Sequence, residues 1–224
     1  MPRFLRESSL SLVFFALFAA ALAGDAVAGW AAFNDDAATH AQETIGFWRY
    51  LTTSAFGRDV LENWQSEYLQ FTLYILLTVW LLQTGSNESK PPSRAGRESD
   101  AEQRLGAHAT ADSPRWARAG GWRTRLYSNS LVLAMAAIWI VSWAGQSVTG
   151  RSAFNSDRIA HHESPLSWWQ YVGTAEFWEA TLQNWQSEFL AVGTMVVFSI
   201  YLRQRGSPES KPVGDPHRET ASEG

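Results

Sequence analysis

Charged residues are absent from four stretches of the chain, and polar segments separate these stretches. The uncharged runs are 10–24, 69–82, 128–149 and 189–202. A helix needs about 20 apolar residues to cross a bilayer. The third run has this length, and the others reach it when their flanks lie at the headgroups, where long polar side chains snorkel. The pattern therefore predicts an all-α integral membrane protein with four transmembrane helices, at about 9–29, 66–84, 129–149 and 187–205. The alternative, buried core helices of a soluble protein, is disfavoured because the runs have too little polar face.

The chain also repeats itself at a constant offset. Residues 9–91 align without a gap with residues 130–212, and 32 of the 83 aligned pairs are identical. The segment Asn63–Glu67 (Asn-Trp-Gln-Ser-Glu) recurs at Asn184–Glu188. A period above 100 residues indicates duplicated domains rather than a solenoid. The first run has the basic start of a signal peptide, but its counterpart lies mid-chain, so we interpret it as a retained span.

Each repeat is expected to consist of a span, a polar loop and a second span. Two spans return the chain to its starting side, so the tandem repeats are parallel and related by a pseudo-two-fold axis along the membrane normal. We predict repeat unit 1 at residues 1–90 and repeat unit 2 at 125–206. A disordered linker (91–124) and a disordered tail (207–224) follow the respective units. Short interfacial helices are expected in the two loops, beginning near Asn34 or Asp36 and near Asn155 or Asp157. Thr53 and Thr174 are candidate caps of the helices that follow.

The basic residues predict how the chain lies in the membrane. Fourteen of the 18 Lys and Arg residues precede the first span, lie between the repeats or follow the last span. Positive charge near spans favours the cytoplasmic side. Both termini and the linker 84–124 are therefore predicted to be cytoplasmic, in a multi-pass protein of the cell inner (plasma) membrane. Basic linker residues close to the membrane can also contact anionic lipid.

Composition changes this picture in two ways. The chain has no Cys, which excludes disulfides and Cys-ligated metal sites, and its net charge of −4 gives no footprint for nucleic acid. Its 12 Trp are numerous for 224 residues. Indole rings prefer membrane interfaces, so we interpret Trp as an interfacial belt, with these anchors in or beside the loops: Trp48, Trp64, Trp169 and Trp185.

The repeated motif offers a candidate polar site. At 3.6 residues per turn its Asn and Glu share a helix face. One interpretation is an interfacial anchor, in which these side chains bond loop backbone. The other is a paired, outward-facing polar vestibule that binds a cation or a polar ligand. Its candidate residues are Asn63, Gln65, Glu67, Asn184, Gln186 and Glu188.

A second candidate lies in the loops. Asp36 and His40 are four residues apart, as are Asp157 and His161, so each pair shares one face of a helix. Together the pairs could ligate a divalent metal such as zinc. The simpler interpretation is a helix cap followed by a surface His that pairs with the Asp. No enzyme signature accompanies either candidate: we predict no catalytic residues and no cofactor.

The motif resembles a known family. Residues 62–71, the start 6–12 and the exit 85–90 are similar to an uncharacterised bacterial family of membrane proteins, described as a domain of unknown function. The resemblance covers most of both repeats and implies no activity, cofactor or catalytic residue. Asp25 departs from the Gly-Gln arrangement that the second repeat has at Gly145-Gln146.

These observations predict a non-catalytic membrane protein, structural or accessory in the cell envelope. One alternative is a small transporter or channel subunit that uses the vestibule, and another is metal binding by the loops. The expected partners are the lipid bilayer and either a membrane-protein partner or further copies of the chain in a homo-oligomer, with no nucleic acid.

Overall fold

The computed structural model describes residues 3–220 and consists, in this range, of helices and turns without a strand. The all-α class predicted from the sequence is confirmed. The elements are α1 (Arg3–Glu7), α2 (Ser9–Thr39), α3 (Phe47–Tyr50), α4 (Ser54–Leu77), η1 (Pro92–Arg94), η2 (Gly106–His108), α5 (Arg115–Ala119), α6 (Gly121–Ser128), α7 (Ser130–Ala160), α8 (Trp168–Tyr171) and α9 (Ala175–Tyr201).

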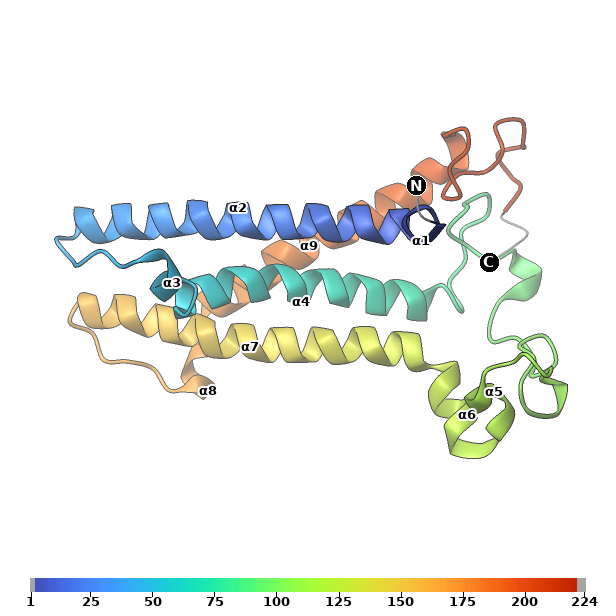
Figure 1. Cartoon of the computed structure of the whole chain (residues 1–224), viewed down its shortest axis with the longest axis horizontal. Helices are drawn as coiled ribbons and strands as arrows, with labels where there is room; N and C mark the ends of the chain where they lie inside the picture. The colour runs from blue at the N-terminus through green and yellow to red at the C-terminus, as the bar shows by residue number, and fades with distance from the viewer. Residues whose placement is uncertain (1–2, 221–224) are drawn as a thin grey trace. The chain divides into compact units, whose positions relative to one another are not determined.

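Four of these helices are long: α2, α4, α7 and α9 (Figure 1). Two of them, α2 and α7, are long and apolar enough to cross a membrane, with mean hydropathies of 2.1 and 1.7 over their most apolar 18 residues. Both run about ten residues beyond the expected ends at 29 and 149. Helices α4 and α9 begin 12 residues before the expected spans and carry charged residues in these added turns. A membrane character of the chain thus rests on two helices.

The chain divides into two compact units, which we describe separately. The first unit comprises Met1–Val60 and Val148–Leu166, and the second comprises Leu61–Ser147 and Ser167–Gly224. This division follows contacts, whereas the predicted domains follow the sequence repeat. The repeat-based boundaries stay a prediction, and their residues 1–2 and 221–224 lie outside the described part of the chain.

The first unit is built around two loops held by asparagine side chains. Asn34 donates from Nδ2 to the Ile45 carbonyl (3.0 Å) and accepts at Oδ1 from the Ile45 amide (2.8 Å). Asn155 makes the same two bonds with Leu166, at 2.9 and 2.8 Å. We expected a helix to begin near Asn34, but α2 continues through it to Thr39, because the asparagine caps the returning loop instead.

An aromatic residue fills the space inside the first of these loops. Tyr50 of α3 is buried and its ring lies 5.6 Å from that of Phe33 and 5.5 Å from that of Phe56. A Cβ added at Gly29 would lie 2.3 Å from the Tyr50 hydroxyl, so glycine leaves the room that the ring needs. The helix that follows is capped by Thr53, whose Oγ1 accepts from the Phe56 amide (3.3 Å). Each loop does contain a short helix, α3 or α8, but it lies further along the chain than the positions near Asn34 and Asn155 where we expected it to begin.

The second unit contains most of α4, the first part of α7, and α9. Its core is aromatic: the Trp143 ring of α7 lies about 6 Å from the rings of Phe177, Trp178 and Trp185 of α9. Thr174 caps α9 by accepting from the Phe177 amide. Such aromatic clusters favour edge-to-face and offset pairs, which stabilise the packing of α7 on α9 beyond the area that they bury.

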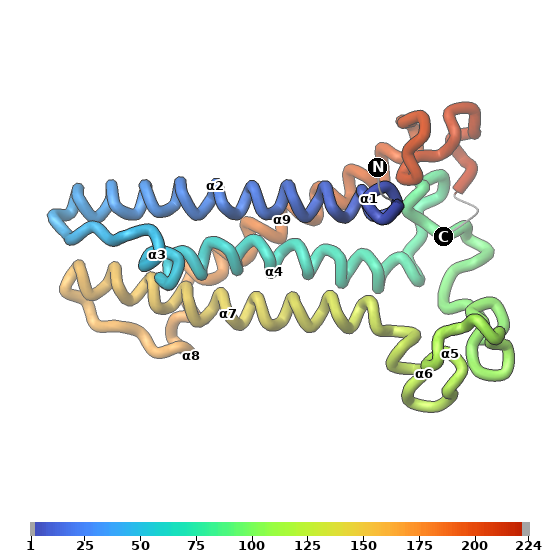
Figure 2. The backbone as a smooth tube through the Cα atoms, in the orientation of Figure 1, coloured from blue at the N-terminus to red at the C-terminus, as the bar shows by residue number. Residues whose placement is uncertain are grey.

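The exits from α4 and α9 have the same local structure. Gly85 and Gly206 adopt φ angles of 86° and 85°, which favour glycine. The Ser89 hydroxyl oxygen accepts from the Gln83 amide (2.8 Å), and the Ser210 oxygen accepts from the Gln204 amide (2.9 Å). Beyond the first exit, the backbone passes through η1, η2 and α5 before α6 (Figure 2). The disorder expected of 91–124 stays a prediction about the chain in solution.

Candidate functional site

The repeated motif places one polar side chain inside the second unit. Gln65 has no exposed surface. Its Nε2 donates to the Glu62 carbonyl (3.1 Å), and its Oε1 accepts from the Trp185 indole Nε1 (2.7 Å). The bond joins α4 to α9 and connects one motif to the other. Because the amide and the indole are partly or fully shielded from solvent, each satisfies a polar group that would otherwise be costly to bury.

The other candidate vestibule residues surround this bond unevenly. Asn184 donates from Nδ2 to the Ala180 carbonyl (2.8 Å) and is half-buried. The exposed members are Asn63, Glu67 and Gln186. Glu188 is partly buried and lies within electrostatic range of the Glu67 carboxyl. The structure thus brings the two glutamates of the motif near each other, whereas the two glutamines have different surroundings.

Further polar groups line the interior of the second unit, and the sequence reasoning gave them little weight. Gln146 and Thr181 are 1% and 0% exposed. Thr181 accepts at Oγ1 from the Trp143 indole (3.4 Å), and Ser147 accepts at Oγ from the Trp168 indole (2.9 Å). The available signal was the cluster of Gln and Ser inside the apolar run of α7, since polar residues there need partners across an interface.

A small cavity lies between α4 and α9, away from the motif. Its volume is about 280 Å³, and its wall is largely apolar, with four polar side chains. The Tyr74 hydroxyl donates to the Glu88 carboxylate. The polar side chains of this cavity are Gln70, Tyr74, Glu88 and Glu209. Glu88 and Glu209 occupy matching positions of the two exits, so this is a second pair of repeated glutamates.

The candidate metal residues form two separate pairs in the first unit. The Asp36 carboxylate lies 3.4 Å from the His40 Nδ1, which also contacts the Asp36 carbonyl (2.9 Å). The His161 Nδ1 contacts the Asp157 carbonyl (2.8 Å). Among residues 3–220, no three His, Asp or Glu side chains gather as a metal would require. Each histidine is thus bonded within its own turn, but the helix cap of the simpler interpretation is not formed, because α2 and α7 continue through Asp36 and Asp157.

The candidate tryptophan anchors divide into two kinds. Trp48 and Trp169 sit on α3 and α8 and are 80% and 77% exposed. Trp64 is 37% exposed, whereas Trp185 is half-buried and donates to Gln65. Large exposed indoles are unfavourable in water and favourable at a headgroup boundary. The two largely exposed rings therefore retain the properties of anchors, and Trp185 has a packing role.

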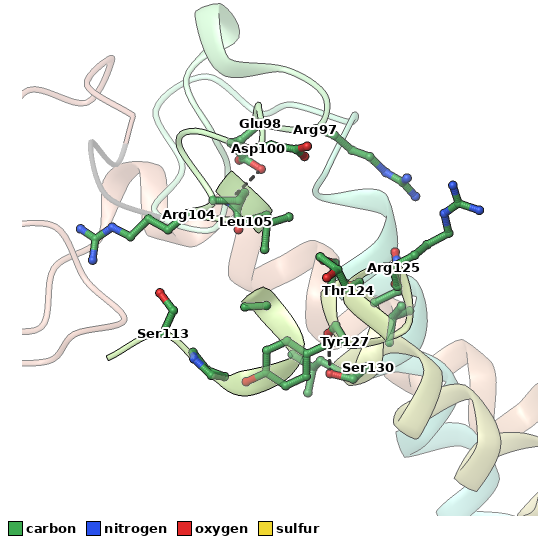
Figure 3. Close-up of a pocket in the computed structure, with 18 of the residues that line it drawn as sticks. Arg97, Glu98, Asp100, Arg104, Leu105, Ser113, Thr124, Arg125, Tyr127 and Ser130 are labelled. Atoms are coloured by element: carbon green, nitrogen blue, oxygen red, sulfur yellow. Dashed lines mark hydrogen bonds between the residues drawn. The ribbon is translucent and has the colours of Figure 1, made fainter. Parts of the chain in front are cut away.

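A larger open cavity of about 1090 Å³ lies where α4 ends and α7 begins (Figure 3). Ile75, Leu76 and Val79 form part of an apolar wall. The charged residues that line it come from the linker and α6, and they are Arg97, Glu98, Asp100, Arg104, Asp112 and Arg125. The Arg97 guanidinium carbon lies 5.7 Å from the centre of the Trp80 ring. The cavity thus combines apolar surface with arginine and indole groups.

Comparison with known proteins identifies a family and goes no further. The chain belongs to the family described as "Domain of unknown function (DUF6766)", whose model matches residues 1–222. No curated protein and no solved structure matches the chain. The resemblance to an uncharacterised domain is therefore confirmed, and the geometry alone carries the argument about function.

Proposed function

We propose that this chain is a non-catalytic protein of a bacterial inner membrane, structural or accessory in the cell envelope. In this proposal α2, α4, α7 and α9 contribute four spans as two parallel tandem repeats. Both termini and the linker face the cytoplasm, and α3 and α8 lie at the outer interface. The proposal starts from two observations described above, the two helices that are apolar enough to cross a membrane and the family membership, and it adds the number of spans and their orientation.

The observation that carries the proposal is the inverted distribution of polar groups in the second unit. Gln65 and Thr181 are fully buried and bonded to indoles, while Val141 and Leu190 are 70% and 68% exposed. Water would favour the opposite distribution. Lipid favours apolar surfaces outside and hydrogen-bonded polar groups at helix interfaces. Exposed apolar residues on α2, such as Phe15 at 71%, fit the same environment.

Local structure supports the duplication within this proposal. The loops that follow α2 and α7 are clamped by matching asparagines, and the exits from α4 and α9 are closed by matching serines. Matching residues make matching bonds about 121 residues apart, as descent from one ancestral unit requires. A unit that begins and ends on one side of the bilayer yields the parallel topology.

Reporter fusions test the topology. Alkaline phosphatase is active only outside the cytoplasm and green fluorescent protein folds only inside it, so each site has two opposite readouts. Fusions after Ala109 and after Val213 should be fluorescent and lack phosphatase activity, whereas fusions after Thr44 and after Glu163 should show the reverse. Phosphatase activity at Ala109 would contradict the orientation, and cytoplasmic signals at all four sites would contradict the four spans.

A small transporter or channel subunit is the second candidate, and one observation favours it. Two pairs of repeated glutamates lie along α4 and α9: Glu67/Glu188 near the middle of the helices, and Glu88/Glu209 in the exits that follow them. Between them are the polar groups of Gln70 and Tyr74. A cation pathway needs such acidic entrances. The buried Gln65–Trp185 bond closes the interface beside the first pair, which is why we rank this candidate second.

Flux through liposomes distinguishes the two candidates. Purified full-length chain is reconstituted beside a Glu67→Gln/Glu188→Gln variant, with Glu176→Gln/Glu179→Gln as a control of equal charge change on α9. Transport predicts cation flux that the first variant loses and the control keeps. Equal flux in all three proteins, or no flux in any, supports the structural role.

Mild cross-linking followed by co-purification then identifies the membrane-protein partner, or the second copy of the chain, to which an accessory protein binds.

A further inference from the structure

We infer that the cavity between the end of α4 and the start of α7 binds the headgroup phosphate of an anionic phospholipid, held by Arg97 and Arg125 beside the Trp80 ring. The inference rests on the proposed membrane location and names a ligand that this location supplies. All the residues concerned belong to the second unit.

The cavity lies at the depth where a cytoplasmic headgroup would be. Trp80 comes three residues after the last residue of α4, and Arg125 comes five residues before the first residue of α7. In the proposed topology both positions mark the inner boundary of a span. Tryptophan and arginine are the side chains that favour this boundary, where one end is apolar and the other is wet.

The lining matches the two parts of a lipid. Side chains of α4 (Ile75 and Leu76), of the turn after it (Val79) and of α7 (Leu131 and Val132) provide apolar surface for the first carbons of the acyl chains. The linker and α6 provide the charged groups, among them three arginines. An open cavity of about 1090 Å³ has room for a headgroup with its glycerol.

The arginines that would hold the phosphate have no carboxylate to neutralise them. Arg97 and Arg125 form no ion pair within the described residues. Arg97 lies over the Trp80 ring, which orients its guanidinium. Both guanidinium groups extend toward the same side in Figure 3, and the Arg104 guanidinium extends away from them. Planar guanidinium groups bind phosphate oxygens in a bidentate manner.

Two of the three acidic residues of the lining, Glu98 and Asp100, do not neutralise Arg97 and Arg125, and the third, Asp112, forms no ion pair with either arginine in the part of the chain that the structure describes. Glu98 is bonded to the Lys90 ammonium, which removes its charge from competition. Figure 3 shows the carboxyl groups of Glu98 and Asp100 at the end of the cavity remote from the Arg125 guanidinium. The cavity is thus polarised, with its basic end beside α4, and this charge distribution selects an anion over a zwitterion.

The test compares two double variants with the same change of net charge. Arg97→Gln/Arg125→Gln removes the proposed ligands, and Arg115→Gln/Arg118→Gln removes two arginines of α5 that do not line the cavity. Arg97→Lys/Arg125→Lys keeps the charge. Binding to full-length protein in neutral detergent is measured by native mass spectrometry with phosphatidylglycerol, phosphatidylcholine and inorganic phosphate as separate probes.

The wild-type chain should bind phosphatidylglycerol in preference to phosphatidylcholine. Each arginine near a membrane surface contributes about 1 kcal/mol to the free energy of binding anionic lipid. Loss of both should therefore weaken the binding of phosphatidylglycerol to the cavity variant about thirtyfold. The α5 variant should change binding by less than about threefold, and the lysine variant should lie between them. Equal loss in the cavity and α5 variants would show diffuse charge attraction and overturn the site. Equal binding of the two lipids, or binding of inorganic phosphate as tight as that of phosphatidylglycerol, would also overturn it.

This measurement is independent of the topology. Detergent presents the cavity from any side, so selective binding combined with contrary reporter fusions would contradict the proposed orientation and leave the anion site standing. Correct fusions without selective binding would contradict the lipid site alone. Comparable unfolding temperatures for all variants verify that a loss of binding does not reflect unfolding.

Discussion

The two aligned halves of the sequence agree in the loops of the first unit and differ in the helices of the second. Asn34 and Asn155 make the same pair of bonds to the backbone 11 residues further on, with lengths that differ by at most 0.1 Å. Gln65 and Gln186 belong to identical five-residue motifs, yet the first is fully buried and the second is exposed. The two asparagines thus have the same role in both halves, whereas the two glutamines have different roles.

The difference follows from where each side chain finds its partner. The asparagines bond within their own loop, so 12 consecutive residues contain both donor and acceptor, and a repeated segment repeats the bond. Gln65 bonds to Trp185, 120 residues away. Its surroundings depend on which helices pack around it, and these are not equivalent for Gln186. Sequence identity preserves local bonds more readily than it preserves tertiary ones.

The strongest test of the agreement is removal of the two clamps. Asn34→Ala and Asn155→Ala each remove two hydrogen bonds and leave backbone groups unsatisfied, so each should lower the free energy of unfolding by about 2–3 kcal/mol. Asn155→Ala should cost slightly more, because the Trp30 indole also donates to the Ile45 carbonyl (2.7 Å) in the first loop. Denaturant unfolding of the detergent-solubilised chain measures both.

An exposed neighbour provides the control for the clamps. Asp35 follows Asn34 and points to solvent, so Asp35→Ala should change stability by less than about 0.5 kcal/mol. If one asparagine variant resembles this control while the other is strongly destabilised, the two loops are not equivalent and the agreement between the halves fails.

The second test concerns the disagreement between the motifs. Gln65→Leu leaves the Trp185 indole without its acceptor and should cost about 1–2 kcal/mol, as interhelical bonds do in membrane proteins. Gln186→Leu changes an exposed side chain and should stay within about 0.5 kcal/mol. The double variant Gln65→Leu/Trp185→Phe should cost less than the sum of its single changes, since both remove one bond. Additive costs would show that the bond contributes nothing.

The sequence predicted local features of this molecule better than its tertiary ones. The helical class and the Thr174 cap follow from hydropathy and capping rules, which depend on neighbouring residues. The hydropathy pattern did not predict where α2 and α7 end, because polar helical turns beyond a span have the same hydropathy as a loop. The burial of Gln65 could not be predicted, since it depends on the Trp185 indole of another helix.

A smaller effect distinguishes the lysines of the two exits. Lys90 pairs with Glu98, while Lys211 donates to four backbone carbonyls, including that of Gly85. The hydrogen bond from Lys90 holds the pKa of Glu98 below its ordinary value of 4.5. Burial, with Arg203 nearby, holds the pKa of Lys211 below its ordinary value of 10.5.

The signs of the two pH dependences are therefore different. The stabilisation from Glu98 is complete above pH 4.5 and is lost as the pH falls through its lowered pKa. For Lys211 the unfolded chain holds its proton to higher pH than the folded chain, so stability rises as the pH approaches 10.5. The Glu98→Gln variant should lie below wild type at pH 7 by less than about 1 kcal/mol, and the difference should shrink as the pH falls below 4.5. A constant difference across this range would mean that the pair carries no stability.

The smallest expected effect returns to residues on which the halves agree. Trp48 and Trp169 are almost equally exposed, at 80% and 77%. Because each ring is largely exposed and contacts the neighbouring ring of its own short helix, Phe47 or Trp168, Trp48→Ala and Trp169→Ala should each change stability in detergent by about 0.5 kcal/mol or less. In a bilayer, lipids brominated near the headgroup should quench the fluorescence of both rings. The part of the tryptophan fluorescence that these lipids quench should therefore fall by the same amount in either variant. Quenching lost in one variant and retained in the other would place α3 and α8 at different depths, and the agreement between the two loops would then extend to their hydrogen bonds but not to their position in the membrane.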